Sequence, residues 1–136
     1  MAEDQPGEIE TVYLTLDDVL GLHGLIISAT ATEAADQLRN REGLESALAR
    51  PVAYAHYENA DLALQATVLA HGIAEGQQFI DGNKRTALVA MLTFLEINGL
   101  EVNVSDAELA AWIISFSAGA TPEDVAKLIR SAATPR

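Results

Sequence analysis

Apolar residues recur along most of this chain at intervals of three and four, which is the spacing of one face of an α-helix. Short polar stretches rich in Gly, Asn, Asp, Ser and Thr separate these apolar segments. The pattern predicts about six helices, at residues 16–27, 44–49, 62–75, 83–97, 106–116 and 122–129. The expected fold class is therefore all-α, with helices packed on helices.

Helix start and stop signals flank several of these segments. Thr15-Leu-Asp-Asp18 and Ser105-Asp-Ala-Glu108 have the spacing of a capping box, in which the first and fourth residues bond each other's backbone amides. Thr121 precedes a proline, which suits the first turn of a helix because the amide it lacks has no intrahelical partner there. Asn98-Gly99 indicates a C-terminal stop.

The stretch between the first two long helices is less regular. Residues 29–40 mix small, acidic and polar side chains, which fits either a helix or an ordered loop. Pro51 is expected to end the short helix before it, because the residue preceding a proline resists helical geometry. Residues 52–57 then fit either a short extended segment, with Tyr54 and Tyr57 close to the polar loop after the next helix, or an ordinary connection.

Three features indicate where the core lies. The segment at 83–97 is apolar on nearly all sides, which predicts a helix buried in the middle of the domain. His23 shares a face with Val19 and Leu20 and is expected to be a hydrogen-bonded core histidine. Trp112 falls at core spacing and is expected to pack inside rather than to hold a ligand.

Composition narrows the class of protein. A chain of 136 residues with 49% hydrophobic content fits one domain with a sizeable core. Its net charge of −12 argues against general nucleic-acid binding and against anionic membrane surfaces, both of which need a basic face. No apolar run approaches the roughly 18 residues of a membrane span. The absence of cysteine fits a cytoplasmic protein. Residues 1–10 are expected to form a disordered lead without signal-peptide character, and residues 11–132 the single domain.

The candidate chemistry lies in the polar loop at residues 77–85. Lys84 and Arg85 stand side by side there, just after Asp81-Gly82-Asn83, a turn in which Asp81 or Asn83 suits the capping position of the helix that follows. Free amides at a helix start and two cations together make an anion site, and a phosphate-bearing ligand is the natural candidate. The alternative is an ordinary capped helix start with two solvated charges.

The stretch Phe79-Ile-Asp-Gly-Asn-Lys-Arg-Thr-Ala87 resembles the signature loop of the death-on-curing (Doc) branch of the Fic/Doc superfamily. That signature runs His-x-Phe-x-Asp-(Gly/Ala)-Asn-Lys-Arg. The similarity continues upstream to Leu44–Pro51 and downstream to Asn98-Gly99, and the resemblance covers roughly residues 11–130. The resemblance implies a compact bundle around a buried central helix, with a flap near the site that pins the target's backbone.

The resemblance also implies roles for the loop residues. Gly82, Asn83 and Lys84 would form an anion nest, Arg85 would clamp a phosphate, and Asp81 would hold Mg²⁺ or orient the target hydroxyl. ATP would be the substrate, and its γ-phosphate would pass to a threonine of elongation factor Tu. A separate antitoxin chain would inhibit the protein.

Branch identity follows from two neighbouring positions. Classical Fic proteins, which transfer AMP, have a second glycine where this chain has Lys84 and a second arginine where it has Leu88. Both departures are similar to the Doc pattern, which implies phosphoryl rather than AMP transfer.

One departure concerns the chemistry itself. An ungapped match puts Gln77 where the family has its catalytic histidine, and an amide cannot accept a proton near neutral pH. His71 is six residues away, nearly two helical turns, and is expected to be a surface or packing histidine. Three alternatives remain open: a phosphotransferase toxin that is weakened or uses water or Asp81 as proton acceptor, a non-catalytic nucleotide- or partner-binding relative, and a helical interaction module without a ligand.

Overall fold

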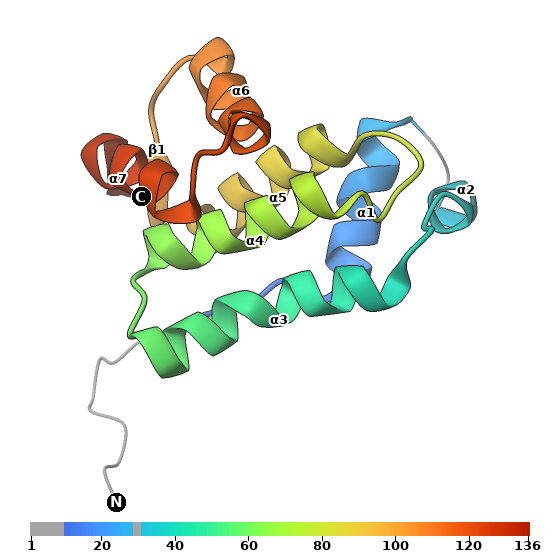
Figure 1. The fold of residues 1–136 in the computed structure, drawn as a ribbon, viewed down its shortest axis with the longest axis horizontal. Coiled ribbons are helices and arrows are strands. Elements are labelled where there is room, and N and C mark those ends of the chain that lie inside the picture. The colour runs from blue at the N-terminus through green and yellow to red at the C-terminus, as the bar shows by residue number, and fades with distance from the viewer. Residues whose placement is uncertain (1–9, 29–30) are drawn as a thin grey trace, which may run out of the picture.

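The computed structural model describes residues 10–28 and 31–136. The expected disordered lead at 1–10 therefore lies, apart from its last residue, outside the described residues. Within the described ranges the chain forms seven α-helices, one short 3₁₀-helix and two short strands (Figure 1). Their bounds are α1 Leu16–Ile26, α2 Ala31–Asp36, α3 Arg41–Glu58, α4 Leu62–Gly76, α5 Asn83–Ile97, β1 Leu100–Val102, α6 Asp106–Ser115, η1 Phe116–Ala118, α7 Pro122–Ala132 and β2 Ala133–Pro135. The predicted all-α class is confirmed.

Two adjacent helices, α4 and α5, form the centre of the bundle. Figure 1 shows α3, α4 and α5 lying side by side, with α1 crossing them near the loop that joins α4 to α5. α3 and α7 pack on α4, while α1 and α6 pack on α5. The buried side chains of α4 include an unbroken run from Gln65 to Ala70. The most buried helix is thus α4 rather than the predicted α5, because α4 is covered by α3, α5 and α7 at once.

Local signals at the helix starts are largely realised. The capping boxes Thr15–Asp18 and Thr121–Asp124 both form, with the side chains of the first and fourth residues bonding each other's backbone N–H groups. At Ser105 only one half of the predicted box is present, the bond from the Glu108 N–H to the Ser105 hydroxyl. These caps fix where α1, α7 and α6 begin.

The prediction that a helix stops before Pro51 was wrong. α3 is continuous for 18 residues with Pro51 inside it, and residues 52–57 are helical rather than an extended flap. Leu44, Ala47 and Pro51 are its buried residues, spaced three and four apart, so they form one face against α4. A proline inside a helix costs about 3 kcal/mol through a lost hydrogen bond and a steric clash. Burial of this face offsets that cost.

The tyrosines of α3 are consequently far from the loop. Tyr57 is 80% exposed at the end of α3, and about 24 Å of helix separates it from Arg41 near the loop. The segment that does run beside the loop is residues 37–40, where Leu38 makes an isolated antiparallel bridge with Phe79. Residues 29–40, left open by the sequence, contain the short helix α2 followed by this extended piece.

In the C-terminal part, α6 and η1 lie beside the start of α5 next to the loop, and α7 packs on α4. Trp112 is buried as predicted, and so are Leu109, Ile113 and Phe116 around it and Val125 and Ile129 of α7. Leu128 of the same helix is 44% exposed, whereas Ala126 is buried. β1 pairs antiparallel with β2, so residues 100–102 are extended.

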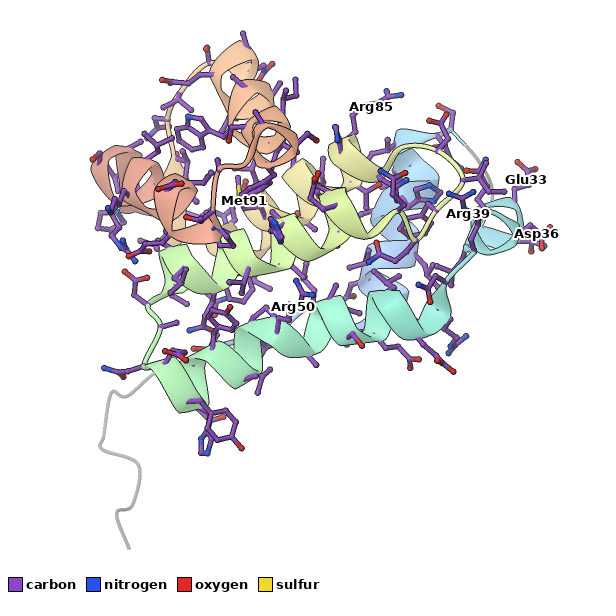
Figure 2. All side chains as sticks on the ribbon, viewed as in Figure 1. Glu33, Asp36, Arg39, Arg50, Arg85 and Met91 are labelled. Carbon is purple, nitrogen blue, oxygen red and sulfur yellow. The ribbon has the colours of Figure 1, made fainter. Side chains whose placement is uncertain are left out.

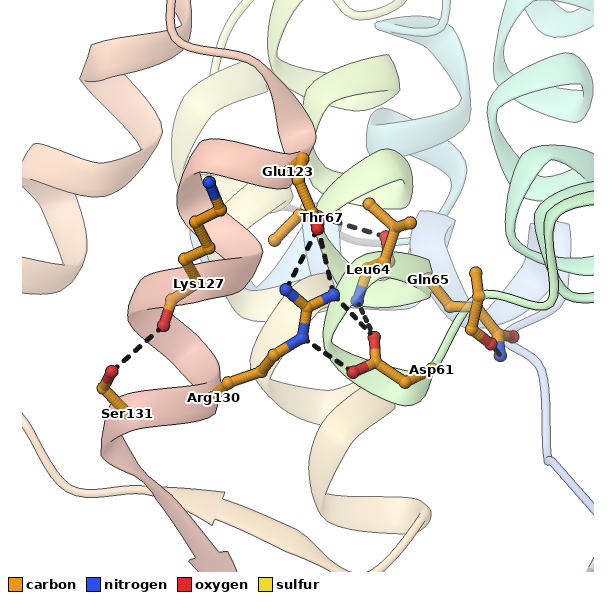
Figure 3. A network of polar contacts seen from close by, with 9 residues as sticks. Asp61, Leu64, Gln65, Thr67, Glu123, Lys127, Arg130 and Ser131 are labelled. Carbon is orange, nitrogen blue, oxygen red and sulfur yellow. Dashed lines mark hydrogen bonds and ion pairs between the residues drawn. The ribbon is translucent and has the colours of Figure 1, made fainter.

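An ion-pair network ties α7 to the start of α4 (Figure 3). The Arg130 guanidinium donates to both carboxylate oxygens of Asp61, at 2.7 and 3.1 Å, and to Glu123 at 3.1 Å. Asp61 is also the N-cap of α4, since its Oδ1 accepts from the Leu64 N–H. The Arg130 hydrogen bond holds the pKa of Asp61 below its usual range. Among the described residues, no helix combines the length and apolar character that crossing a bilayer requires.

Candidate functional site

The loop at residues 77–82 joins the C-terminus of α4 to the N-terminus of α5. Both of its ends adopt left-handed backbone geometry, with φ of +54° at Gln77 and +79° at Gly82. These two turns reverse the chain within six residues, so the loop sits on the two central helices. Its backbone is therefore supported by rigid elements, as an accurate binding site requires.

Phe79 anchors the loop in the core. Its side chain is fully buried, so it acts as a hydrophobic plug that fixes the loop. The His23 ring lies flat on it, with centroids 3.8 Å apart and an interplanar angle of 11°. Asn83 secures the backbone of the same residue, because its Oδ1 accepts from the Phe79 N–H and its Nδ2 donates to the Phe79 carbonyl.

His23 also holds the next part of the loop. Its Nε2 lies 2.8 Å from the Asp81 carbonyl oxygen, and since a carbonyl only accepts, Nε2 carries the proton. The imidazole is completely buried in α1, which confirms the predicted hydrogen-bonded core histidine. It reaches the backbone of the loop from the interior and so serves to position Asp81.

The extended segment at 37–40 supports the loop from its other side. The Gln78 carbonyl accepts from the N–H groups of Arg39 and Asn40, at 2.7 and 3.2 Å, and the Ile80 N–H donates to the Gln37 carbonyl at 2.9 Å. The buried Gln78 side chain adds a bond from Nε2 to the Gly72 carbonyl. The loop is thus fixed between α1, α5 and the chain that leads into α3.

All six residues singled out in the sequence line one cavity of about 330 Å³ at the surface. They are Gln77, Asp81, Gly82, Asn83, Lys84 and Arg85, joined by Ile80. Asn83 takes part through its backbone, because the residue is only 8% exposed and its side-chain amide is used by Phe79. The remaining site side chains are exposed or half-exposed around the cavity.

The start of α5 differs from the sequence expectation in its capping. Neither Asp81 nor Asn83 caps the helix: Gly82 occupies the N-cap position, and no side chain bonds the first-turn amides. The Asp81 carboxylate instead accepts from the Gly82 N–H at 2.8 Å, and Asn83 turns back to Phe79. The first turn of α5 also lacks acidic residues, so its partial positive charge faces the cavity uncompensated.

The two cations of the site differ in their surroundings. Lys84 Nζ donates to the Ser117 hydroxyl at 2.9 Å and lies 3.6 Å from Glu75 Oε2, while Ser117 donates to the same carboxylate. Arg85 extends from α5 into solvent and makes no hydrogen bond or ion pair within the described chain (Figure 2). Arg85 is therefore free to meet a ligand, whereas Lys84 must exchange partners.

None of the three histidines of the chain lines this cavity. His23 lies behind the loop, and His56 packs edge-on against Tyr57 in α3. His71 meets the Phe116 ring edge-on, and burial together with the nearby Arg50 lowers its pKa. Gln77 is exposed at the cavity, and its amide has no proton-accepting state near neutral pH.

The donor set suits phosphates and a metal ion that shares their oxygens. Asp81 is the only carboxylate lining the cavity, and the described residues contain no cluster of three or more His, Cys, Asp or Glu able to hold a metal. Mg²⁺ is commonly bound by one or two carboxylates together with substrate phosphates and water. The cavity therefore fits a metal that arrives with a phosphorylated substrate, held by Asp81.

Sequence reasoning missed Glu75, Ser117 and the bond from His23 to Asp81. Glu75 and Ser117 are separated by 42 residues, and His23 and Asp81 by 58, so no local pattern pairs them. The only sequence signal was the position of Glu75 at the end of the helix before the loop.

Comparison with known proteins places these residues in a family context. A family model described as the Fic/DOC family matches residues 13–95, more than half of the chain. Toxin Doc of Mycolicibacterium smegmatis (strain ATCC 700084 / mc(2)155) is 34% identical over 94 residues, which cover 68% of this chain and 68% of that protein. The matched region of the family model includes the whole loop and most of α5.

Proposed function

The chain belongs to the Doc branch of the Fic/DOC family, and from this premise we propose that it is a Doc-type toxin. It binds Mg²⁺-ATP at residues 77–85 and transfers a phosphoryl group to a hydroxyl of a target protein, at a rate limited by Gln77. One observation carries the proposal. The uncapped start of α5, Lys84, Arg85 and the Asp81 carboxylate meet at one cavity.

Each residue has a distinct part in this proposal. The first-turn amides of α5 and the Lys84 ammonium hold phosphate oxygens, and Arg85 closes on them as a bidentate clamp. Asp81 holds Mg²⁺, which neutralises phosphate charge when bound. Asp81 currently bonds the Gly82 N–H, so metal binding would also free that amide for a phosphate.

Gln77 determines the rate. A general base contributes about 10²–10⁴ to rate, and no histidine is placed to supply it. Phosphoryl transfer nevertheless depends mainly on positioning and charge neutralisation, so slow transfer remains feasible with water or Asp81 as the proton acceptor. The protein is accordingly a weakened transferase.

A second candidate is a non-catalytic relative that binds a nucleotide or a partner without reacting. The absence of any histidine from the cavity lining favours it. AMP transfer is less favoured, because Leu88 stands where an AMP-transferring relative would have its second arginine. For phosphoryl or AMP transfer, the first target to examine is elongation factor Tu, so the reaction takes place in the cytoplasm. A separate antitoxin chain is the expected inhibitor.

Intact-mass measurement of elongation factor Tu after incubation with Mg²⁺-ATP tests this function. The protein, Gln77→His and Gln77→Asn are compared, since histidine and asparagine both tolerate the left-handed backbone at this position. We expect a slow phosphate-sized gain with the unaltered protein and with Gln77→Asn, and a gain about 10²–10⁴ faster with Gln77→His. No gain with Gln77→His would remove the proposed transfer to this target and leave the non-catalytic candidate.

A further inference from the structure

A second hollow of about 160 Å³ adjoins the loop cavity. Lys84, Arg85 and Leu88 of α5 form one of its sides, and Ala110, Ile113 and Ile114 of α6 form the other. Lys84 and Arg85 line both this hollow and the loop cavity, so the two spaces meet at these residues. We call the hollow between α5 and α6 the apolar slot.

The chemistry of the apolar slot is opposite to that of the loop cavity. Its lining exposes only apolar atoms, with Ile113 buried behind it and Ile114 57% exposed at its edge. The small side chain of Ala110 contributes to the space between the two helices. A site of this kind holds a flat apolar group by contact area and offers no hydrogen-bond donor or acceptor to its edges.

Two adjoining sites, one for anions and one apolar, match the two ends of a nucleotide. Leu88 lies one helical turn beyond Lys84, about 6 Å along α5. A molecule with its phosphates at Lys84 and Arg85 can therefore place its base against Leu88 and Ile114. The Arg85 guanidinium, free within the described chain, is suited to stack on the face of an aromatic base.

We propose that the apolar slot holds the base of the bound nucleotide without distinguishing adenine from guanine. This inference rests on the proposed phosphate site. It adds the position of the base and the reason why the slot does not discriminate between adenine and guanine. Discrimination between bases needs polar groups that match their edges, and the slot presents none. ATP and GTP should then bind with affinities within about threefold of each other.

Calorimetric titration with ATP, GTP and inorganic tripolyphosphate tests the inference, each with Mg²⁺. Ala110→Leu fills the slot, and Ala111→Leu makes the same change at the next, exposed residue of α6, outside the slot. We expect Ala110→Leu to weaken ATP and GTP by about tenfold, the scale of one to two misplaced methylene contacts, and to leave tripolyphosphate unchanged. Ala111→Leu should change none of the three. Ile114→Ser, at an exposed wall residue, should reproduce the selective loss and serves if Ala110→Leu folds poorly.

The outcomes separate this inference from the proposed function. Binding of all three ligands with no effect of Ala110→Leu or Ile114→Ser overturns the base site and leaves the phosphate site standing. A preference for ATP over GTP greater than tenfold overturns the lack of discrimination. No binding of any ligand to the unaltered protein overturns both proposals.

Discussion

The side-chain amide of Asn83 holds both backbone polar groups of Phe79. Its Oδ1 accepts from the Phe79 N–H at 3.0 Å, and its Nδ2 donates to the Phe79 carbonyl at 2.9 Å. The first residue of α5 is thereby bonded to the middle of the preceding loop. The ring of Phe79 is in turn buried against His23. Asn83 shapes the loop with its side chain and leaves only its backbone for a ligand.

Asn83→Asp should destabilise the protein, because a carboxylate accepts from the Phe79 N–H but cannot donate to the Phe79 carbonyl. An unsatisfied buried group costs about 1–3 kcal/mol, and we expect a loss of that size in the free energy of unfolding, measured with urea. Asn103→Asp is the matched control, because Asn103 is exposed and makes only a long bond to Thr134. Equal losses for the two variants would show that the Phe79 bonds do not stabilise the loop.

Gly82→Ala tests how closely the loop is packed on α1. A Cβ there would lie 3.2 Å from Ile27 Cγ2 and 3.6 Å from the His23 ring, at a φ of +79°. Gly99→Ala meets no atom within 4 Å at a φ of +89°, so it isolates the cost of the left-handed backbone, about 1–2 kcal/mol. We expect Gly82→Ala to exceed that cost in urea unfolding and to weaken ATP binding. ATP affinity should be unchanged in Gly99→Ala, and a matching loss there would refute the loop-specific effect.

Glu75→Gln should strengthen nucleotide binding, since Glu75 is the anionic partner that Lys84 must leave to meet a phosphate. Exposed ion pairs contribute about 0.2–1 kcal/mol, which corresponds to a gain in ATP affinity of up to about fivefold. Glu58→Gln, an exposed glutamate at the end of α3, removes the same charge far from the loop. If both variants raise the ATP affinity equally, the change in net charge explains the gain, and the role of the Glu75–Lys84 ion pair is contradicted.

The network in Figure 3 predicts a pH dependence of stability. Arg130 lowers the pKa of Asp61 in the folded protein. The ion pair therefore stabilises the fold above pH 3.8, the usual pKa of an aspartate, and this stabilisation is lost as the pH falls through the lower pKa of folded Asp61. Asp61→Asn keeps an oxygen for the Leu64 N–H but removes the charge. The Asp61 side chain is 51% exposed, so the ion pair contributes little. We expect Asp61→Asn to lower the free energy of unfolding by at most about 1 kcal/mol at pH 7 and to leave it equal to that of the unaltered protein in acid. A constant difference across that range, measured by urea unfolding, would contradict this. Asp106→Asn controls for a charge without an ion pair in the described chain.

Local sequence signals were sufficient for the helices that begin at caps and for the loop residues that share one ungapped motif. Thr15, Asp61 and Thr121 bond amides within three residues, so their effect is readable in the sequence. α3 was misjudged because only burial against α4 makes Pro51 acceptable inside a helix. The apolar slot could not be foreseen either, because it depends on how α6 lies against α5.

The same limit applies within the site. The sequence places Lys84 and Arg85 side by side without showing a partner for either, but folding pairs Lys84 with Glu75 and Ser117 and leaves Arg85 free within the described chain. Asn83 was expected among the anion-binding groups, yet its amide is used to hold Phe79. The sequence identified which residues lie at the candidate site, but their individual partners depend on tertiary contacts that the sequence does not show.

Titration of Mg²⁺-ATP into the protein, Lys84→Ala and Lys127→Ala measures the central claim most directly. The chain has two lysines, one at the loop cavity and one exposed on α7, so the two variants remove the same charge from different places. A charge-assisted hydrogen bond contributes about 1.5–3 kcal/mol, and Lys84→Ala should weaken ATP by about 10- to 100-fold, with Lys127→Ala unchanged. Equal affinities for the two variants, or no binding by the unaltered protein, would contradict a phosphate site at residues 77–85.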